Sequence, residues 1–278
     1  MAEQTDSNPG PAAEPSTIWG ERADDWAEVM EGATGWGIPV YRRILDRLPV
    51  DESTRLLDVG CGAGRFCRIA SDRGAQVAGL DVTKEFIEIA QKLTPEGEFE
   101  LGEMESLPWQ NDSFDVITGF NSFFLAADMV GALREAHRVA RPGGAVALTI
   151  FGRPERCDST RLFASMRRLV EGESSESSES ESKPAMQPAL HEEGVIRGVA
   201  REAGLRPTEV AYFKFEEEYR DLETMLRGFL AAPPGRMATR ASSAGEVRAA
   251  LSEAVRPNVG TDGVVRLREE VRYLIGTT

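Results

Sequence analysis

The sequence predicts an α/β fold: a doubly wound, mostly parallel sheet of seven strands with helices on both faces, an N-terminal helical cap and an insertion after the fifth strand. Two observations support it. Short apolar segments alternate with amphipathic ones from residue 55 to residue 151, the order expected of parallel strands joined by covering helices. A glycine-rich turn, Gly60 to Gly64, joins the first strand to its helix.

The N-terminal part divides into a tail and a cap. Residues 1–16 are polar and proline-rich, and we expect a disordered tail because they can bury little apolar surface. Residues 17–50 predict a helical cap of two amphipathic helices. The first runs from 17 to about 32, and the second from 40 to 48, before Pro49. The break between them is the segment GWGIP.

The predicted core, residues 51–152, carries the strand and helix alternation. Its strands are 55–59, 76–80, 99–101, 114–119 and 145–151, and its helices are 64–73, 83–93 and 129–139. Arg141-Pro142-Gly143-Gly144 predicts a turn before the fifth strand.

Residues 153–278 predict helices on the substrate side together with the last strands. The helices are 159–170, 191–203 (ended by Gly204) and 221–230, and the strands are 209–217 and 264–274. Between them, at about 171–184, lies a low-complexity acidic run of Ser and Glu. We expect it to be a disordered loop, because it lacks the apolar surface to offset its ordering entropy.

Composition disfavours several classes of function. The chain has 32 Lys and Arg against 46 Asp and Glu, a formal charge of −14, which disfavours nucleic acid and anionic membranes as partners. Its three cysteines show no disulfide or metal-ligand spacing, so no metal site is predicted. The sequence shows neither a leader peptide nor a spanning apolar run, and the expected compartment is the cytoplasm.

The glycine turn predicts a nucleoside site. Glycines there allow a tight turn and let a ligand approach the backbone at a helix N-terminus. Asp81 ends the second strand, beside the first in a doubly wound sheet, where a carboxylate can accept both ribose hydroxyls. The alternative is that Asp81 only caps the following helix.

The local chemistry disfavours a dinucleotide. Arg65 stands where the third glycine of the G-x-G-x-x-G pattern should be, and Asp58 would repel a pyrophosphate. A carboxylate at Asp58 suits a cationic ligand instead. S-adenosylmethionine, with its sulfonium and its α-ammonium, fits this requirement.

These segments give the chain a clear family likeness. LLDVGCGAGRF (56–66), GLDVTKEFIEIAQ (79–91), GEMESLPW (102–109) and LREAHRVARPGG (133–144) follow one another at the spacing of known motifs. The sequence resembles the class I (Rossmann-like) S-adenosylmethionine-dependent methyltransferases, of the small-molecule type related to quinone-biosynthesis methyltransferases. The resemblance covers about residues 55–151.

The resemblance implies a set of cofactor-binding residues. Asp58 would orient the amino group, Asp81 would hold the ribose, and Glu103, where relatives more often carry Asp, would accept from the adenine amine. The full set is Asp58, Gly60, Cys61, Gly62, Asp81, Val82, Glu103, Met104, Gly119 and Phe120.

The implied reaction is methyl transfer to an O, N or C nucleophile of a small, apolar or aromatic molecule. Charge is dispersed along the reaction, so a dry site and in-line positioning matter more than a charged catalyst. Relatives often carry His-His where this chain has Phe124-Leu125. The candidates for a catalytic residue are Tyr41 and Asn121, needed only if the acceptor arrives protonated. The candidate substrate contacts are Trp36, Tyr41, Asn121 and Phe124, with Trp36 as a possible lid.

Three other functions stay open at this point. The main alternative is a non-catalytic S-adenosylmethionine-binding sensor or scaffold, since no base is evident. The others are a nucleotide-dependent oxidoreductase and an RNA methyltransferase, which the acidic balance disfavours.

Overall fold

The structure is a computed structural model that describes residues 13–171, 190, 192 and 194–278. Within these residues seven strands form one sheet in the order β3-β2-β1-β4-β5-β7-β6. The strands are β1 Arg55–Val59, β2 Gln76–Asp81, β3 Glu98–Leu101, β4 Phe114–Phe120, β5 Ala140–Phe151, β6 Arg206–Tyr219 and β7 Val265–Thr277. Strands β1 to β5 pair in parallel, whereas β7 is antiparallel to both β5 and β6. The predicted seven-stranded, mostly parallel sheet is confirmed.

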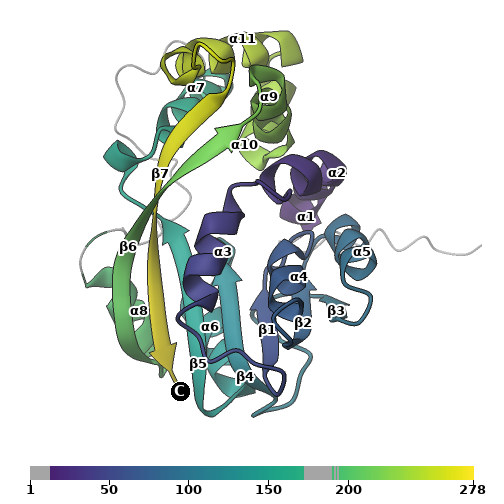
Figure 1. The fold of residues 1–278 in the computed structure, drawn as a ribbon, viewed down its shortest axis with the longest axis vertical. Coiled ribbons are helices and arrows are strands. Elements are labelled where there is room, and N and C mark those ends of the chain that lie inside the picture. Colours follow the sequence, from purple (N-terminus) through teal and green to yellow (C-terminus); the bar gives the residue numbers. More distant parts are fainter. Residues whose placement is uncertain (1–12, 172–189, 191, 193) are drawn as a thin grey trace, which may run out of the picture.

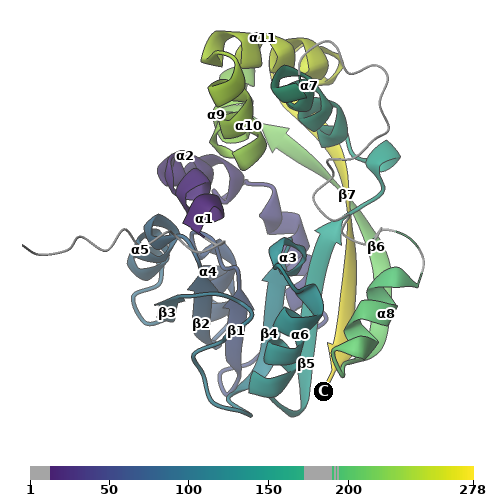
Figure 2. The same ribbon diagram turned by 180° about the vertical axis from the view of Figure 1, so that it is seen from behind.

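Helices cover both faces of this sheet (Figures 1 and 2). On one face lie α3 (Gly37–Leu45), α4 (Arg65–Ser71) and α5 (Lys84–Leu93), and on the other α6 (Met129–Val139) and α8 (Val195–Glu202). Successive side chains of a strand point to opposite faces. Leu56 therefore packs in the first core and Leu57 in the second, both fully buried.

The N-terminal segment is less regular than predicted. Instead of one helix it forms α1 (Ala13–Gly20), α2 (Ala23–Asp25) and a π-helical turn, η1 (Trp26–Met30). Residues 13–16, which we assigned to the tail, belong to α1. Pro15 is tolerated there because the first turn of a helix needs no partner for its N–H groups. Residues 1–12 lie outside the described part.

Helix α3 also departs from expectation. It begins at Gly37, inside the predicted break, and Pro39 sits in its first turn. The predicted turn at 141–144 is wrong as well, because β5 already begins at Ala140. These residues form an irregularity within the strand, where the pairing with β4 shifts register between Phe114 and Val116 and Gly143 takes a φ of 78°.

Strands β6 and β7 are the longest of the sheet, with 14 and 13 residues. β7 pairs with β5 only from Val271 onward, so residues 265–270 pair with β6 but not with β5, beyond the carboxyl end of β5. At roughly 3.4 Å per residue, this part of the hairpin extends about 20 Å past the parallel sheet. In Figure 1 the two strands run from the base of the sheet up to a separate group of helices.

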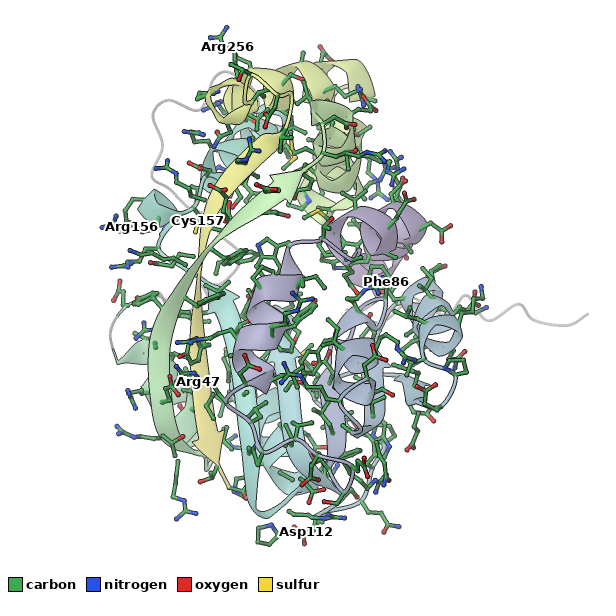
Figure 3. The ribbon with its side chains drawn as sticks, in the orientation of Figure 1. Arg47, Phe86, Asp112, Arg156, Cys157 and Arg256 are labelled. Carbon is green, nitrogen blue, oxygen red and sulfur yellow. The ribbon has the colours of Figure 1, made fainter. Side chains whose placement is uncertain are left out.

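That group, which we call the helical lobe, contains α7 (Ser159–Glu171), α9 (Leu222–Ala231), α10 (Pro233–Ala241) and α11 (Ala244–Val255). It has its own buried core, made of residues such as Leu162, Met166, Met225, Phe229, Val247, Leu251 and Leu267. Figure 3 shows Arg256 at the lobe end of the molecule, Asp112 at the opposite end, and Cys157 beside β7 where the two parts meet.

The prediction identified α7 and α9 but missed α10 and α11. Pro233-Pro234 begins α10, since proline is tolerated in the first turn of a helix. Ser243 caps α11 by accepting from the Glu246 N–H, a signal that the sequence did contain. Helix α8 begins at Val195 rather than 191, after Gly194 with a φ of 90°.

Two further expectations concern the acidic loop and membrane-spanning helices. Of the predicted acidic loop, Glu171 is the last residue of α7 and 172–184 lie outside the described residues. None of the helices described is long and apolar enough to cross a lipid bilayer.

The N-terminal segment lies between the core and the lobe. Figure 3 shows Phe86 of α5 beneath the N-terminal helices, where its ring lies 6.1 Å from that of Trp19. On the other side, Arg236 and Arg240 of α10 form ion pairs with Glu21. The segment is therefore held from both sides.

The lobe core generates a stability prediction. Leu267→Ala removes a fully buried side chain from the extended part of β7, and we expect a loss of about 2–5 kcal/mol in the free energy of unfolding. Leu125→Ala, at a side chain that is 56% exposed, should change it by less than about 0.5 kcal/mol. Urea denaturation of both variants checks this, and equal effects would contradict a packed lobe.

Candidate cofactor site at the glycine loop

The glycine loop between β1 and α4 has a backbone that only glycine accepts without strain. Gly60, Gly62 and Gly64 have φ values of 72°, 53° and 81°. A Cβ on Gly60 would lie 2.4 Å from the Cβ of Ser122. The Gly60 N–H donates to the Leu80 carbonyl at 2.7 Å, which ties the loop to β2. The loop is a fixed cradle lined by backbone.

Asp58 lies on β1 just before this loop and is buried. Its Oδ1 accepts a hydrogen bond of 2.7 Å from the hydroxyl of Thr118, its parallel partner on β4. Burial raises the pKa of Asp58 to about 8, and the nearby Glu31 and Asp81 add to the increase. A cation bound nearby would therefore favour the ionised form of this buried carboxyl group.

Asp81 ends β2 next to the loop, as predicted. Its Oδ2 accepts from the Gly62 N–H at 3.0 Å, and its Oδ1 from the Thr83 N–H at 2.9 Å. Thr83, not Asp81, is the N-cap residue of α5, so the simple capping alternative is wrong. Burial raises the pKa of Asp81. The side chain holds the loop beside the place expected for the ribose.

The adenine-side residues gather on the loop that follows β3. The Gly102 N–H donates to the Asp81 carbonyl at 3.0 Å, which brings this loop against the end of β2. Val82 and Met104 are half-buried there, whereas the side chain of Glu103 is exposed. Leu101, the parallel partner of Asp81, is 55% exposed, an apolar side chain that sequence reasoning did not select.

At the carboxyl end of β4 the backbone is unusual. Gly119 is buried, and a Cβ on it would lie 2.5 Å from the ring of Phe123. Asn121 has a φ of 50°, an uncommon value for a residue with a side chain. The Asn121 N–H donates to the carbonyl of Thr149 on β5 at 3.2 Å. The Thr149 hydroxyl in turn donates to the side-chain oxygen of Asn121, also at 3.2 Å. β4 and β5 together hold this residue.

Tyr41 and Cys61 are buried beside these groups. The Tyr41 ring contacts Phe120 and Phe66, with centroids 4.7 and 5.5 Å apart. Burial raises the pKa of the Tyr41 hydroxyl well above its usual value and does the same to the Cys61 thiol. Both groups therefore stay protonated at neutral pH and serve as packing surfaces.

Aromatic rings from five parts of the chain meet near the ends of β4 and β5. We call them the aromatic cluster: Trp36, Phe124, Phe151, Phe163 and Phe215. Phe151 contacts Trp36 at 6.5 Å, Phe124 at 5.6 Å and Phe163 at 6.3 Å, yet it remains 48% exposed. Two of the predicted substrate contacts, Trp36 and Phe124, thus lie together. Phe163 and Phe215 belong to the same cluster, although the sequence analysis did not assign them to the substrate site.

Sequence reasoning also missed an acidic residue of the site. Glu31 follows the π-helical turn η1, and its carboxylate lies against the glycine loop. Its Oε1 accepts from the Trp26 indole at 2.8 Å and from the Ala63 N–H at 3.2 Å. Burial raises the pKa of Glu31 to about 7. No local sequence pattern marks this residue, because its place depends on how the N-terminal segment folds back.

Comparison with known proteins agrees with this geometry. Residues 57–148 match the family described as "Methyltransferase domain". The 27-O-demethylrifamycin SV methyltransferase of Amycolatopsis mediterranei is 32% identical over 146 residues, 48% of this chain and 53% of that protein. The demethylmenaquinone methyltransferase of Chlorobaculum parvum is 30% identical over 110 residues, 39% of this chain and 46% of that protein. The chain thus spans about half the length of these relatives.

A solved structure supports the fold. That of phosphoethanolamine N-methyltransferase 2 of Haemonchus contortus, in complex with phosphomonomethylethanolamine and S-adenosylhomocysteine, has a TM-score of 0.55. It is 18% identical, and the likeness covers 92% of this chain and 56% of the other. Strand order, glycine loop and sequence match agree: residues 57–148 match a methyltransferase domain, and the fold is that of a solved methyltransferase.

Proposed function

We propose that this protein transfers a methyl group from S-adenosylmethionine to an O, N or C nucleophile of a small molecule with apolar or aromatic character. The observation that carries the proposal is the aromatic cluster, with its half-exposed Phe151, beside the ends of β4 and β5. Asn121, which directly follows β4, contacts Thr149, two residues before Phe151 on β5, so the cluster adjoins a predicted substrate contact.

The cofactor residues are part of the same proposal. The glycine loop would cradle the methionine part, Asp58 would orient its amino group, and Asp81 would hold the ribose. The polarity of the site supports this assignment: three buried or half-buried carboxylates suit a ligand that carries positive charge. The loop after β3, with Val82, Glu103 and Met104, would receive the adenine.

The bound cofactor supplies the electrophilic methyl group on its sulfonium. The side chains of this protein would then position the acceptor and exclude water from the site. Aromatic walls give a dry site, which favours a reaction in which charge is dispersed. Asn121, held by Thr149, would fix one wall of the acceptor position.

Neither candidate catalytic residue is suited to remove a proton. Burial raises the pKa of Tyr41, so its hydroxyl stays protonated and cannot accept a proton, and Asn121 has no titratable group. We therefore assign both to positioning. The acceptor would arrive as an amine with a free lone pair, or as an acidic hydroxyl or carbon acid that is already ionised.

The decisive experiment measures release of S-adenosylhomocysteine with a panel of small aromatic and apolar acceptors that carry amines or acidic hydroxyls. Phe151→Ala should raise the KM for an active acceptor at least tenfold, with an unchanged Kd for S-adenosylmethionine. Val259→Ala, another exposed apolar side chain, serves as the control. Cofactor binding without turnover of any acceptor would favour the sensor or scaffold alternative.

The ribose assignment has its own test. Asp81→Ala should weaken S-adenosylmethionine binding by at least ~2 kcal/mol, because both hydroxyls would lose a charged acceptor. Asp72→Ala removes an exposed carboxylate paired with Arg68 and should leave the affinity unchanged. Titration calorimetry on both variants decides; equal affinities would place the ribose elsewhere.

The buried acids predict how stability depends on pH. The folded-state pKa of Asp58, about 8, lies above its unfolded value near 4, so the folded protein holds the extra proton. Stability without ligand should therefore fall as pH rises from about 5 to 8. Asp58→Asn should reduce that decrease by more than about 1 kcal/mol.

The control for this measurement is Asp72→Asn. The ion pair with Arg68 lowers the pKa of Asp72, so this group titrates below the window from pH 5 to 8. Denaturant titrations at several pH values should show that the free energy of unfolding of this variant changes with pH as steeply as that of the wild type. An Asp58→Asn slope equal to that of the wild type would show that Asp58 is already ionised at pH 5.

A further inference from the structure

We propose that Glu31 is a ligand of the cofactor, a carboxylate that the N-terminal segment presents to the cationic methionine end of S-adenosylmethionine. The proposal rests on the assignment of the glycine loop to that part of the cofactor. Glu31 lies outside the matched methyltransferase domain, residues 57–148. Neither the motifs nor the family match points to it.

The first argument is an unpartnered oxygen. Oε1 of Glu31 accepts from Trp26 and Ala63, but Oε2 is buried and has no hydrogen-bond partner among the described residues. The residue is only 7% exposed. A buried carboxylate oxygen without a donor is costly, so such atoms in native proteins usually serve a ligand, an ion or a water molecule.

The second argument is the position of the carboxylate on the loop. A Cβ on Gly62 would lie 2.2 Å from Oε1 of Glu31 and 3.5 Å from Oε2. Glycine is thus required at 62 not only by its φ of 53° but also by the approach of Glu31. The unpartnered oxygen lies against the backbone that the cofactor would contact.

The third argument is charge. Glu31, Asp58 and Asp81 repel one another, and none of the ion pairs within the described part of the chain includes any of them. Arg65 does contact Glu31, but its Nε donates to the backbone carbonyl at 2.7 Å. A ligand with a sulfonium and an ammonium group would supply the missing positive charge.

The lobe explains how the carboxylate is held there. Arg227 of α9 forms ion pairs with Asp25 and Glu28, and Gly228 lies against Val29 and Met30. The π-helical turn between these contacts ends with the Glu31 N–H donating to the Trp26 carbonyl at 3.1 Å. Such turns are frequent at functional sites. The lobe thereby fixes a residue of the cofactor site from outside the core.

The test is titration calorimetry of S-adenosylmethionine and S-adenosylhomocysteine with the full chain and three variants. Glu31→Gln keeps the shape and the acceptor for Trp26 but removes the charge, and it should weaken S-adenosylmethionine binding about 10- to 100-fold. Asp24→Asn removes an exposed carboxylate of the same segment that takes no part in the contacts described above, and should change neither affinity. Trp26→Phe removes the indole donor and keeps the Glu31 charge.

The two ligands identify which cation Glu31 meets. An equal loss for both ligands supports contact with the ammonium group, which they share, and a loss for S-adenosylmethionine alone supports the sulfonium. If Glu31 only latched Trp26 to the loop, Trp26→Phe would weaken binding as much as Glu31→Gln or more, because Glu31→Gln keeps the acceptor for the indole, and the proposal would be overturned. Unchanged affinities in Glu31→Gln would also overturn it. A wild-type chain that binds neither ligand would instead contradict the cofactor assignment itself.

Discussion

The antiparallel pairing of β6 with β7 is the constraint on which the rest of this structure depends. The hairpin continues beyond the carboxyl end of β5, where residues 265–270 pair with β6 but no longer with β5. The helices of the lobe pack on this extension and stand over the edge of the sheet where β1, β2 and β4 end (Figure 1). The N-terminal segment then fills the space between lobe and core and completes the glycine-loop site.

The site itself is built on an electrostatic imbalance. In an already acidic chain, Glu31, Asp58 and Asp81 lie close together, and burial raises the pKa of each. A folded protein accepts such a cost only when the groups are protonated or when a ligand compensates them. An adenosyl cofactor with two positive centres is a matching partner, whereas a pyrophosphate would add to the repulsion.

The surface that we propose binds the methyl acceptor is assembled differently. Its aromatic cluster is assembled from residues far apart in sequence: Trp36 at the start of α3, Phe124 after β4, Phe151 at the end of β5 and Phe215 on β6. Four of its five rings, Trp36, Phe151, Phe163 and Phe215, lie outside residues 57–148, the part that matches the methyltransferase-domain family.

The sequence by itself determined the parallel core, the glycine loop and the places of Asp58 and Asp81, because strand periodicity and turn chemistry are local properties of the chain. Helix α6 and strand β1 have the predicted bounds. It did not determine the π-helical turn before Glu31, the irregularity at 141–144 or the length of β6, since these depend on partners distant in sequence. Only the tertiary structure decided which side chains share the site. Glu31 reaches Ala63 because the N-terminal segment folds back and packs between the core and the helical lobe. No spacing in the sequence encodes that contact.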